Sequence, residues 1–407
     1  MRFYPKICGE SRQNTFKQGP SEQAENIFGR AAAPSRLCEE EKKMRPLEGV
    51  TVLDLTRVVA GPFATMIMAD LGARVIKIEN PRDPDYTRDF EPYLIDDDKR
   101  QSAFFAQYNR NKEAITLNLK EEKAKEIFRE LAKKADIVVE NYRAGVMDKL
   151  GLGYKTVKEI APDIVYVSIS GYGQEGEYAM RAGHDINYLA LSGNMSYSGR
   201  EAFGPALYGM QVADIAASQN SVIGVLAAHN QRQLTGKGAH VDVAILDSAI
   251  PFNAMSGVGA MLSGRDPKRE EQLLNGGSLY DFYPTSDGGY MSVGALEPKF
   301  WEAFCRVMGH EDWIEAGCAC PDFREKKAIL RKEFESKTRD YWTKIFANVD
   351  ACVEPVLSVT EALLERKNAR DRDSVINVLS ATDEDQPDSR KYKEKEIWIY
   401  GSPIKFR

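Results

Sequence analysis

Residues 50–78 read VTVLDLTRVVAGPFATMIMADLGARVIKI, and this segment decides the fold. The run over 50–55 is rich in valine and leucine and is typical of a buried strand. Apolar residues recur at helical spacing over 63–71, Gly72 ends that helix, and 73–78 is a second apolar strand. A strand, a helix and a second strand in this order indicate a parallel sheet in an α/β fold.

The same pattern continues through the first half of the chain. Apolar strand segments alternate with helical segments, as a parallel α/β sheet requires. The expected strands are 114–119, 135–140, 164–169 and 240–245, and the expected helices are 121–134, 154–160 and 215–229. The sequence therefore predicts a large Rossmann-like α/β domain.

The pattern changes after residue 245, where a smaller α+β domain is expected. A long helix is predicted over 246–262, and a turn at Asp287-Gly-Gly289 predicts a hairpin over 278–294. Two further helices are expected over 299–308 and 323–347. The predicted boundaries are 47–245 for the large domain, 246–277 for a linker helix, 278–350 for the small domain and 351–407 for a return to the large domain.

The composition excludes some classes of function. The chain has 407 residues and a formal net charge of −6, so it lacks the basic field of a nucleic-acid-binding protein. Its most apolar run, 58–78, contains charged residues, and no run reaches the roughly 18 apolar residues of a membrane span. No signal peptide or C-terminal peroxisomal tripeptide is recognised, so a cytoplasmic location is expected, with an organelle left open.

Residues 1–46 differ from the rest of the chain. They mix lysine, arginine and glutamate, show no apolar period and lack the apolar core of a signal peptide. We expect a disordered extension, or an upstream start with Met44 as the beginning of the fold.

Two short motifs are weak signals. Gly171-Tyr-Gly-Gln-Glu-Gly176 matches a dinucleotide-binding fingerprint, but it lacks the helix and the acidic residue that the fingerprint requires. It predicts a glycine-rich loop at the end of a strand. Cys318 and Cys320 have no second cysteine pair, so a structural position is favoured over a metal site, and no metal is expected.

Four titratable side chains are candidate catalytic residues: His184, Asp185, Asp214 and Glu297. His184 and Asp185 are adjacent and follow a glycine. Asp214 lies in a stretch of small apolar residues, where an unpartnered carboxyl is costly to bury. Each has a structural alternative, which is a helix N-cap for the carboxyls and a surface position for His184.

Basic residues flank the predicted strands of the large domain. In α/β folds such positions hold phosphate groups, although most basic side chains are only solvated. The candidates for a phosphorylated ligand are Arg57, Lys77, Arg110, Lys112 and Arg143.

Several segments resemble, in the same order, the class III CoA-transferase superfamily of the CaiB/BaiF type. These segments are 47–55, 60–62, 70–79 and 170–173. Within the superfamily, Ala182-Gly-His-Asp-Ile-Asn-Tyr188, Gly294-Ala-Leu-Glu-Pro298 and Asp350-Ala-Cys-Val-Glu-Pro-Val356 are similar to the α-methylacyl-CoA racemase branch. The likeness runs from about residue 47 to the C-terminus.

The resemblance implies an enzyme that epimerises the 2-methyl centre of acyl-CoA thioesters. The racemases use a histidine and an aspartate thirty residues apart as two bases, and His184 and Asp214 match this spacing. Their third residue is a glutamate that orients the histidine, and Glu297 fits it. The resemblance further implies an interlocked homodimer and no cofactor beyond the CoA moiety of the substrate. It places CoA contacts at Arg57, Lys77, Arg110 and Arg143.

The transferases of the superfamily provide the alternative. They use an aspartate nucleophile that aligns with Asp185 and usually follows an aromatic residue, whereas His184 precedes it here. The segment Ile215-Ala-Ala-Ser218 is nearer to the transferases than to the racemases. CoA transfer between an acyl-CoA and a carboxylic acid, through an aspartyl-CoA thioester on Asp185, therefore remains the second hypothesis.

Overall fold

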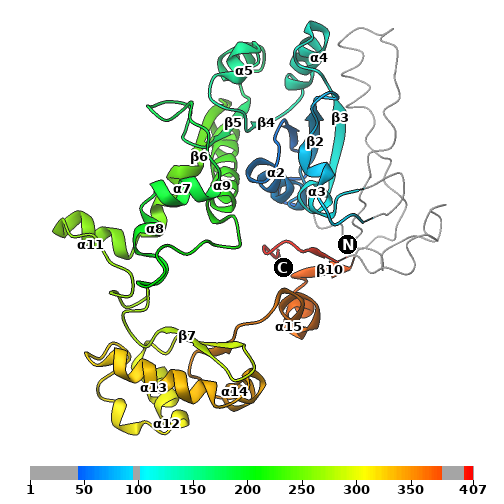
Figure 1. The fold of residues 1–407 in the computed structure, drawn as a ribbon. Coiled ribbons are helices and arrows are strands. Elements are labelled where there is room, and N and C mark those ends of the chain that lie inside the picture. The colour runs from blue at the N-terminus through cyan, green and yellow to red at the C-terminus, as the bar shows by residue number, and fades with distance from the viewer. Residues whose placement is uncertain (1–44, 95–100, 378–397, 407) are drawn as a thin grey trace, which may run out of the picture. The chain divides into compact units, whose positions relative to one another are not determined.

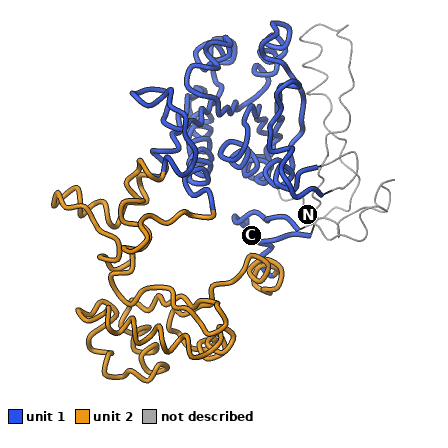
Figure 2. Tube along the Cα trace, viewed as in Figure 1, with its two compact units in different colours: residues 1–188, 210–249, 371–407 blue, residues 189–209, 250–370 orange. Residues whose placement is uncertain are grey.

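The computed structural model describes residues 45–94, 101–377 and 398–406, and the predicted extension over 1–46 lies almost entirely outside them. Figure 1 shows the elements in chain order. The chain divides into two compact units (Figure 2). Unit 1 contains the residues up to 188, 210–249 and those from 371 onward, and unit 2 contains 189–209 and 250–370.

Unit 1 is built on a six-stranded sheet in which every pairing is parallel. Its strands are β1 (Thr51–Asp54), β2 (Arg74–Glu79), β3 (Lys112–Thr116), β4 (Ile137–Glu140), β5 (Val165–Ser170) and β6 (Ala239–Ala244). They lie in the order β3-β2-β1-β4-β5-β6. The Rossmann-like α/β prediction is therefore confirmed. The order reverses between β1 and β4, which is where such folds bind ligands.

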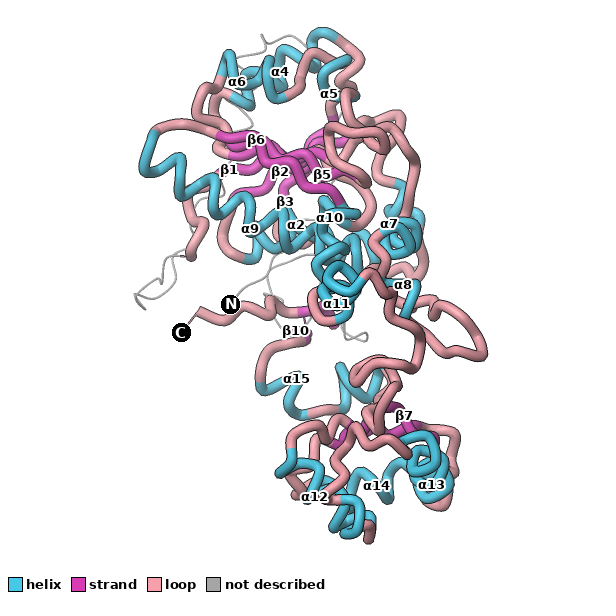
Figure 3. Tube along the Cα trace, turned by 90° about the vertical axis from the view of Figure 1, so that its left-hand side faces the viewer, coloured by secondary structure: helices cyan, strands magenta, loops and turns pink. Residues whose placement is uncertain are grey.

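Helices cover both faces of this sheet (Figure 3). On one face, Leu53, Ile76 and Val138 of neighbouring strands pack into a buried core with the helices α4, α5 and α6. On the other face lie α2 and α9, which contact each other along their lengths. The bounds are α2 (Ala60–Asp70), α4 (Glu122–Ala132), α5 (Val146–Lys149), α6 (Tyr154–Ile160) and α9 (Val212–Thr235). Burial on both faces explains why the central strands β1, β4 and β5 are largely apolar.

Unit 2 has its own core and a small antiparallel sheet. The strands β7 (Asp281–Pro284) and β8 (Tyr290–Val293) form the predicted hairpin, and β9 (Val353–Pro355) pairs with β8. Residues 353–355 were expected in the segment returning to the large domain, but they belong to this sheet. Its helices are α12 (Pro298–Met308), α13 (Phe323–Glu335) and α14 (Arg339–Phe346).

The remaining elements are short. In chain order they are η1 (Tyr86–Asp89), α3 (Ala103–Asn109), α7 (Asp185–Leu191), α8 (Asn194–Tyr197), η3 (Glu311–Trp313), η4 (Glu361–Glu365), α15 (Lys367–Asp371), β10 (Val375–Asn377) and β11 (Trp398–Tyr400). The last two strands pair antiparallel with each other.

Two long helices predicted from the sequence are interrupted. The one expected over 246–262 consists of α10 (Ile245–Ala249), η2 (Ile250–Asn253) and α11 (Ser256–Ser263), with a bend of 81°. Pro251 accounts for the end of α10, because proline lacks an N–H and clashes with the preceding helical turn; the bend itself follows between Asn253 and Ser256. The helix expected over 323–347 is split into α13 and α14, because the Thr338 hydroxyl accepts a hydrogen bond from the Tyr341 N–H and caps a new helix.

No single helix in the described residues is both long and apolar enough to cross a membrane. The bent pair Ile245–Asn253 and Ser256–Ser263 meets that test only by length and composition.

Unit 1 also buries charge between β1, β3 and α2. Asp54 is fully buried, and its carboxylate accepts hydrogen bonds from Lys112 Nζ at 3.0 Å and Thr65 Oγ1 at 2.7 Å. Burial by itself raises the pKa of Asp54, but Lys112, Lys77 and the threonine hydroxyls outweigh it and lower the pKa to about 2. The carboxylate is therefore charged at neutral pH.

We expect Lys112→Met to destabilise unit 1 by about 3 kcal/mol, because it removes the cation that is hydrogen-bonded to the buried Asp54 carboxylate. The measurement is the shift of the urea unfolding curve at pH 7. Lys133→Met is the matched control, since its ion pair with Glu130 at 2.6 Å is partly exposed. That variant is expected to change stability by no more than about 0.5 kcal/mol. Equal effects of the two substitutions would contradict the prediction.

Candidate active site

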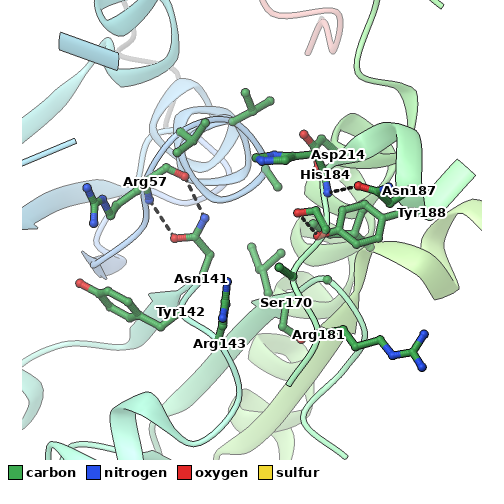
Figure 4. A pocket seen from close by; sticks show the side chains of 18 of the residues that line it. Arg57, Asn141, Tyr142, Arg143, Ser170, Arg181, His184, Asn187, Tyr188 and Asp214 are labelled. Atoms are coloured by element: carbon green, nitrogen blue, oxygen red, sulfur yellow. Dashed lines mark hydrogen bonds between the residues drawn. The ribbon is translucent and has the colours of Figure 1, made fainter. Parts of the chain in front are cut away.

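A pocket of about 400 Å³ lies at the carboxyl ends of four strands of unit 1 (Figure 4). Its lining comes from the loops after β1, β4 and β5, from the residue after β6, from Tyr86 and from the helices α7 and α9. The pocket therefore occupies the position where the strand order reverses, as predicted by the topology. Its polar lining residues include Arg57, Asn141, Arg143, His184, Asn187 and Asp214.

One side of the pocket is formed by the loops after β1 and β4, which clamp each other. The backbone N–H of Arg57 donates to Asn141 Oδ1, and Asn141 Nδ2 donates to the Arg57 carbonyl, both at 2.8 Å. The next residue, Val58, has a φ of 71°, which is rare for a β-branched side chain, and its N–H donates to Asp85 Oδ2 at 3.1 Å. The structure thus holds this corner of the pocket in a conformation that the chain would not adopt alone.

Arg57 and Arg143 supply positive charge on this side. The Arg57 guanidinium donates to both carboxylate oxygens of Asp83, at 3.1 and 3.2 Å, and this ion pair is partly exposed. The Arg143 side chain is exposed and has no ion-pair partner in the part of the chain that the structure describes. A free guanidinium in a pocket is suited to bind a phosphate or carboxylate group.

The opposite side of the pocket carries His184, directly before α7 (Figure 4). The backbone N–H of His184 donates to Asn187 Oδ1 at 3.0 Å, and the backbone N–H of Asn187 donates to the His184 carbonyl at 2.8 Å. This reciprocal contact resembles a capping box and fixes the start of the helix. Gly183 is required here, because a Cβ would lie 2.7 Å from the Tyr188 ring. The His184 imidazole itself is exposed.

Asp214 lies on the same side of the pocket, in the first turn of α9 (Figure 4). Burial, together with the nearby charge of Asp185, raises the pKa of the Asp214 carboxyl to about 7. A carboxyl with such a pKa can act both as an acid and as a base near neutral pH.

Asp185 caps the N-terminus of α9, although it lies far from that helix in the sequence. Its Oδ1 accepts hydrogen bonds from the backbone N–H groups of Ala213 at 2.7 Å and Asp214 at 3.2 Å. These groups have no partner within the helix, and a carboxylate at a helix N-terminus is also favoured by the helix dipole. Asp185 is the first residue of α7, so this contact links the two candidate bases.

The structure thus brings His184, Asp214, Arg57 and Arg143 to one pocket. It does not bring Lys77 or Arg110 there. Lys77 is 1% exposed, and its Nζ donates to the Thr56 carbonyl at 2.8 Å. Arg110 is buried in an ion pair with Asp70 at 2.6 Å. These two cations therefore do not line this pocket and already have partners inside unit 1, which does not favour the predicted contact with CoA.

Glu297 lies in unit 2, directly before α12, and its side chain is exposed. Its proposed contact with His184 stays a prediction. In the described residues no group of three or more histidine, cysteine or acidic side chains is arranged to hold a metal ion. Cys318 and Cys320 are buried in the core of unit 2 together with Cys305.

Sequence reasoning missed Asn141, Asn187 and Tyr188 as parts of the site. Asn141 could have been found, because it is the first residue after a predicted strand and close to Arg143. Asn187 and Tyr188 act through backbone contacts around His184, which no sequence pattern shows.

Comparisons with known proteins agree on the family. Residues 47–391 match the family model for CoA-transferase family III. The chain is 33% identical to human succinyl-CoA:glutarate CoA-transferase, covering 83% of this chain and 77% of that protein. It is also 33% identical to human α-methylacyl-CoA racemase, covering 81% of this chain and 82% of that one.

A solved structure supports the same assignment. The crystal structure of a CAIB/BAIF family protein from Brucella suis has a TM-score of 0.73 and 28% identity, and the match covers 89% of this chain and 93% of that one. With the family model spanning both units, the chain belongs to CoA-transferase family III.

Proposed function

We propose that the protein is an α-methylacyl-CoA racemase, which inverts the 2-methyl centre of branched acyl-CoA thioesters. The observation that carries this proposal is the presence of two proton-transfer side chains, His184 and Asp214, in the lining of one pocket (Figure 4). Inversion needs a base that removes the proton from one face of C2 and an acid that returns a proton to the other face.

The chemistry suits these two residues. The thioester carbonyl acidifies the proton on C2, and its removal gives an enolate. A histidine side chain ordinarily titrates near pH ~6.5 and can act as either partner. Asp214, whose pKa burial raises to about 7, can do the same. The two bases then exchange roles for the opposite epimer.

The enolate oxygen needs hydrogen-bond donors. The N–H groups of Ala213 and Asp214 at the start of α9 are already bound by Asp185. At the start of α7 the N–H groups of His184 and Asn187 are bound as well, so the N–H groups of Asp185 and Ile186 are the better backbone donors for a developing negative charge. In this scheme Asp185 transfers no proton and holds α9 in place.

The CoA moiety would be bound on the other side of the pocket. Arg143 has no ion-pair partner in the described residues. The guanidinium of Arg57 forms an ion pair with Asp83 but stays partly exposed. Both are suited to the phosphate groups of CoA. Proton transfer at C2 changes no oxidation state, so the racemase chemistry calls for no cofactor beyond the CoA carried by the substrate.

Two parts of the proposal follow the family resemblance. Glu297 would accept a hydrogen bond from the far nitrogen of His184, and the chain would form an interlocked homodimer. Exposed apolar side chains in unit 2 support an additional contact surface. Met255, Met261 and Leu262, on and beside α11, are 77%, 81% and 85% exposed. Such groups on a protein surface commonly mark an interface or a bound apolar ligand.

CoA transfer is the second candidate, and relatives named as CoA-transferases favour it. The Asp185 carboxylate would attack the thioester carbonyl and release CoA thiolate, leaving a mixed anhydride. The thiolate would then attack the Asp185 carbonyl, which gives an aspartyl-CoA thioester and frees the first acid. The two hydrogen bonds to Asp185 Oδ1 disfavour this role, because they stabilise the carboxylate and weaken its nucleophilicity.

Incubation of one 2-methylacyl-CoA epimer with the protein in D₂O, without any acceptor acid, separates the two functions. A racemase is expected to form the other epimer and to incorporate deuterium at C2, because the returned proton comes from a base that exchanges with solvent. Mass spectrometry and chiral chromatography measure both. Retention of the C2 proton, with CoA transfer on addition of a free acid, would overturn the racemase.

Substitutions give a second test of the same proposal. His184→Ala is expected to lower racemisation by about 10³-fold, because it removes one of the two bases. Asp185→Asn keeps an oxygen that can accept the α9 N–H groups but loses the nucleophile. In a racemase, Asp185→Asn should therefore retain racemisation. A CoA-transfer activity that survives His184→Ala and is lost in Asp185→Asn would identify a transferase.

The pH profile tests the role of Asp214. Racemisation requires that one of the two bases is protonated and the other is not. The value of kcat/KM is therefore expected to pass through a maximum as the pH is varied, for both epimers. The charge of Asp185 contributes to the raised pKa of Asp214. In Asp185→Asn this charge is absent, so the profile should move to lower pH. A profile that is unchanged, or that moves to higher pH, contradicts the assigned role.

A further inference from the structure

A buried carboxyl group beside the pocket has no role in the proposed mechanism. Glu140 is the last residue of β4, is 3% exposed and does not line the pocket. Its Oε2 accepts a hydrogen bond from the backbone N–H of Tyr142 at 2.8 Å. The carboxyl therefore holds the loop of residues 141–143, all three of which line the pocket.

Glu140 belongs to a polar network that crosses three strands. Its cross-strand neighbour on β5 is Ser168, whose hydroxyl hydrogen-bonds the carboxyl. The Ser168 Oγ lies 3.0 Å from His240 Nε2 on β6, and the His240 ring stacks on Tyr154 with centroids 4.8 Å apart. The carboxyl is therefore held from two sides, by the Tyr142 N–H and by Ser168.

The network contains no counter-charge for Glu140. Within the described ranges no lysine or arginine forms an ion pair with it, and Asp148 and Asp242 are the charged groups that act on it. Burial first, and these two acids in addition, raise the pKa of Glu140 to about 7. Burial lowers the pKa of His240, which disfavours a positive charge on this ring. A buried carboxyl without a cation costs stability, which suggests that it serves the pocket.

The hydrogen bond between Glu140 and the Tyr142 N–H affects the positions of both cations of the pocket, Arg57 and Arg143. Asn141 lies between Glu140 and Tyr142 and makes the two 2.8 Å hydrogen bonds that clamp the backbone of Arg57. Arg143 follows Tyr142 directly. Holding the Tyr142 N–H therefore fixes the direction of the chain on both sides of it, and with it the positions of Arg57 and Arg143.

We propose that Glu140 is a positioning residue that keeps the 141–143 loop in the conformation that binds the phosphate groups of CoA. This inference rests on the proposed function, since it takes CoA as the ligand of the pocket. Glu140 touches neither the substrate nor the reacting atoms. Its loss should weaken CoA binding and leave the chemical step at saturation unchanged.

Three proteins test this inference: the wild type, Glu140→Leu and Glu140→Gln. Calorimetric titration with CoA gives Kd, and steady-state kinetics with a 2-methylacyl-CoA give KM and kcat. Leucine removes the acceptor for the Tyr142 N–H, so Kd and KM are expected to rise about tenfold. Glutamine keeps an acceptor oxygen, so both values should stay within about threefold of the wild type. In both variants kcat should change by no more than about twofold.

Asn118→Ala is the matched control. The Asn118 side-chain oxygen accepts a hydrogen bond from the backbone N–H of Lys120 at 3.3 Å. This is the same contact to the second residue onward that Glu140 makes with Tyr142, but it lies after β3 and outside the pocket. This variant should bind CoA like the wild type. If Glu140→Leu binds CoA as tightly as the wild type, the inference is overturned and the proposed function stands. If the wild type binds no CoA, both are overturned.

Ser168→Ala keeps the test decisive where Glu140→Leu does not fold. It leaves Glu140 in place and removes one of its two hydrogen-bond partners. The expected result is a Kd for CoA about threefold above that of the wild type. An unchanged Kd in a folded Ser168→Ala protein would overturn the inference.

Discussion

The candidate active site depends on the hydrogen bonds between Asp185 and the first turn of α9. Two backbone N–H groups of that turn donate to one carboxylate oxygen, at 2.7 and 3.2 Å. Asp185 opens α7 and follows His184, while Asp214 lies in the turn that it caps. Because Asp185 adjoins His184, this contact links His184 to Asp214, which lies thirty positions later in the sequence. It also places a negative charge beside Asp214, which helps to raise the pKa of that carboxyl.

The parallel sheet could be predicted from the sequence because its central strands are buried on both faces and its strands are separated by helical segments. The direction of single side chains was harder to predict. Lys77 lies between Ile76 and Ile78, which face the core with α4, so its own side chain points to the opposite face and is buried there. A lysine in a strand beside a phosphate site has the same local sequence, so the pattern could not separate the two.

Contacts between distant segments explain what else the sequence did not show. The two hydrogen bonds between Arg57 and Asn141 join residues 84 positions apart, and no sequence motif at either residue predicts them. The same holds for Lys112, which was grouped with ligand-binding cations but neutralises Asp54. By contrast, the pairing of His184 with Asp214 as two bases is a prediction from the family resemblance, which gives their spacing of thirty residues; local propensity does not contain it.

Two buried carboxyls of the sheet respond to pH in opposite directions. The pKa of Asp54 is lowered to about 2, so its contribution to stability is present above pH 3.8 and is lost as the pH falls. The pKa of Glu140 is raised from 4.5 to about 7, so the folded state holds that proton more tightly and loses stability as the pH rises through this range. The paired carboxylate therefore supports the fold. The carboxyl without a cation weakens it at neutral pH, and its position beside the pocket loop gives a functional reason to retain it.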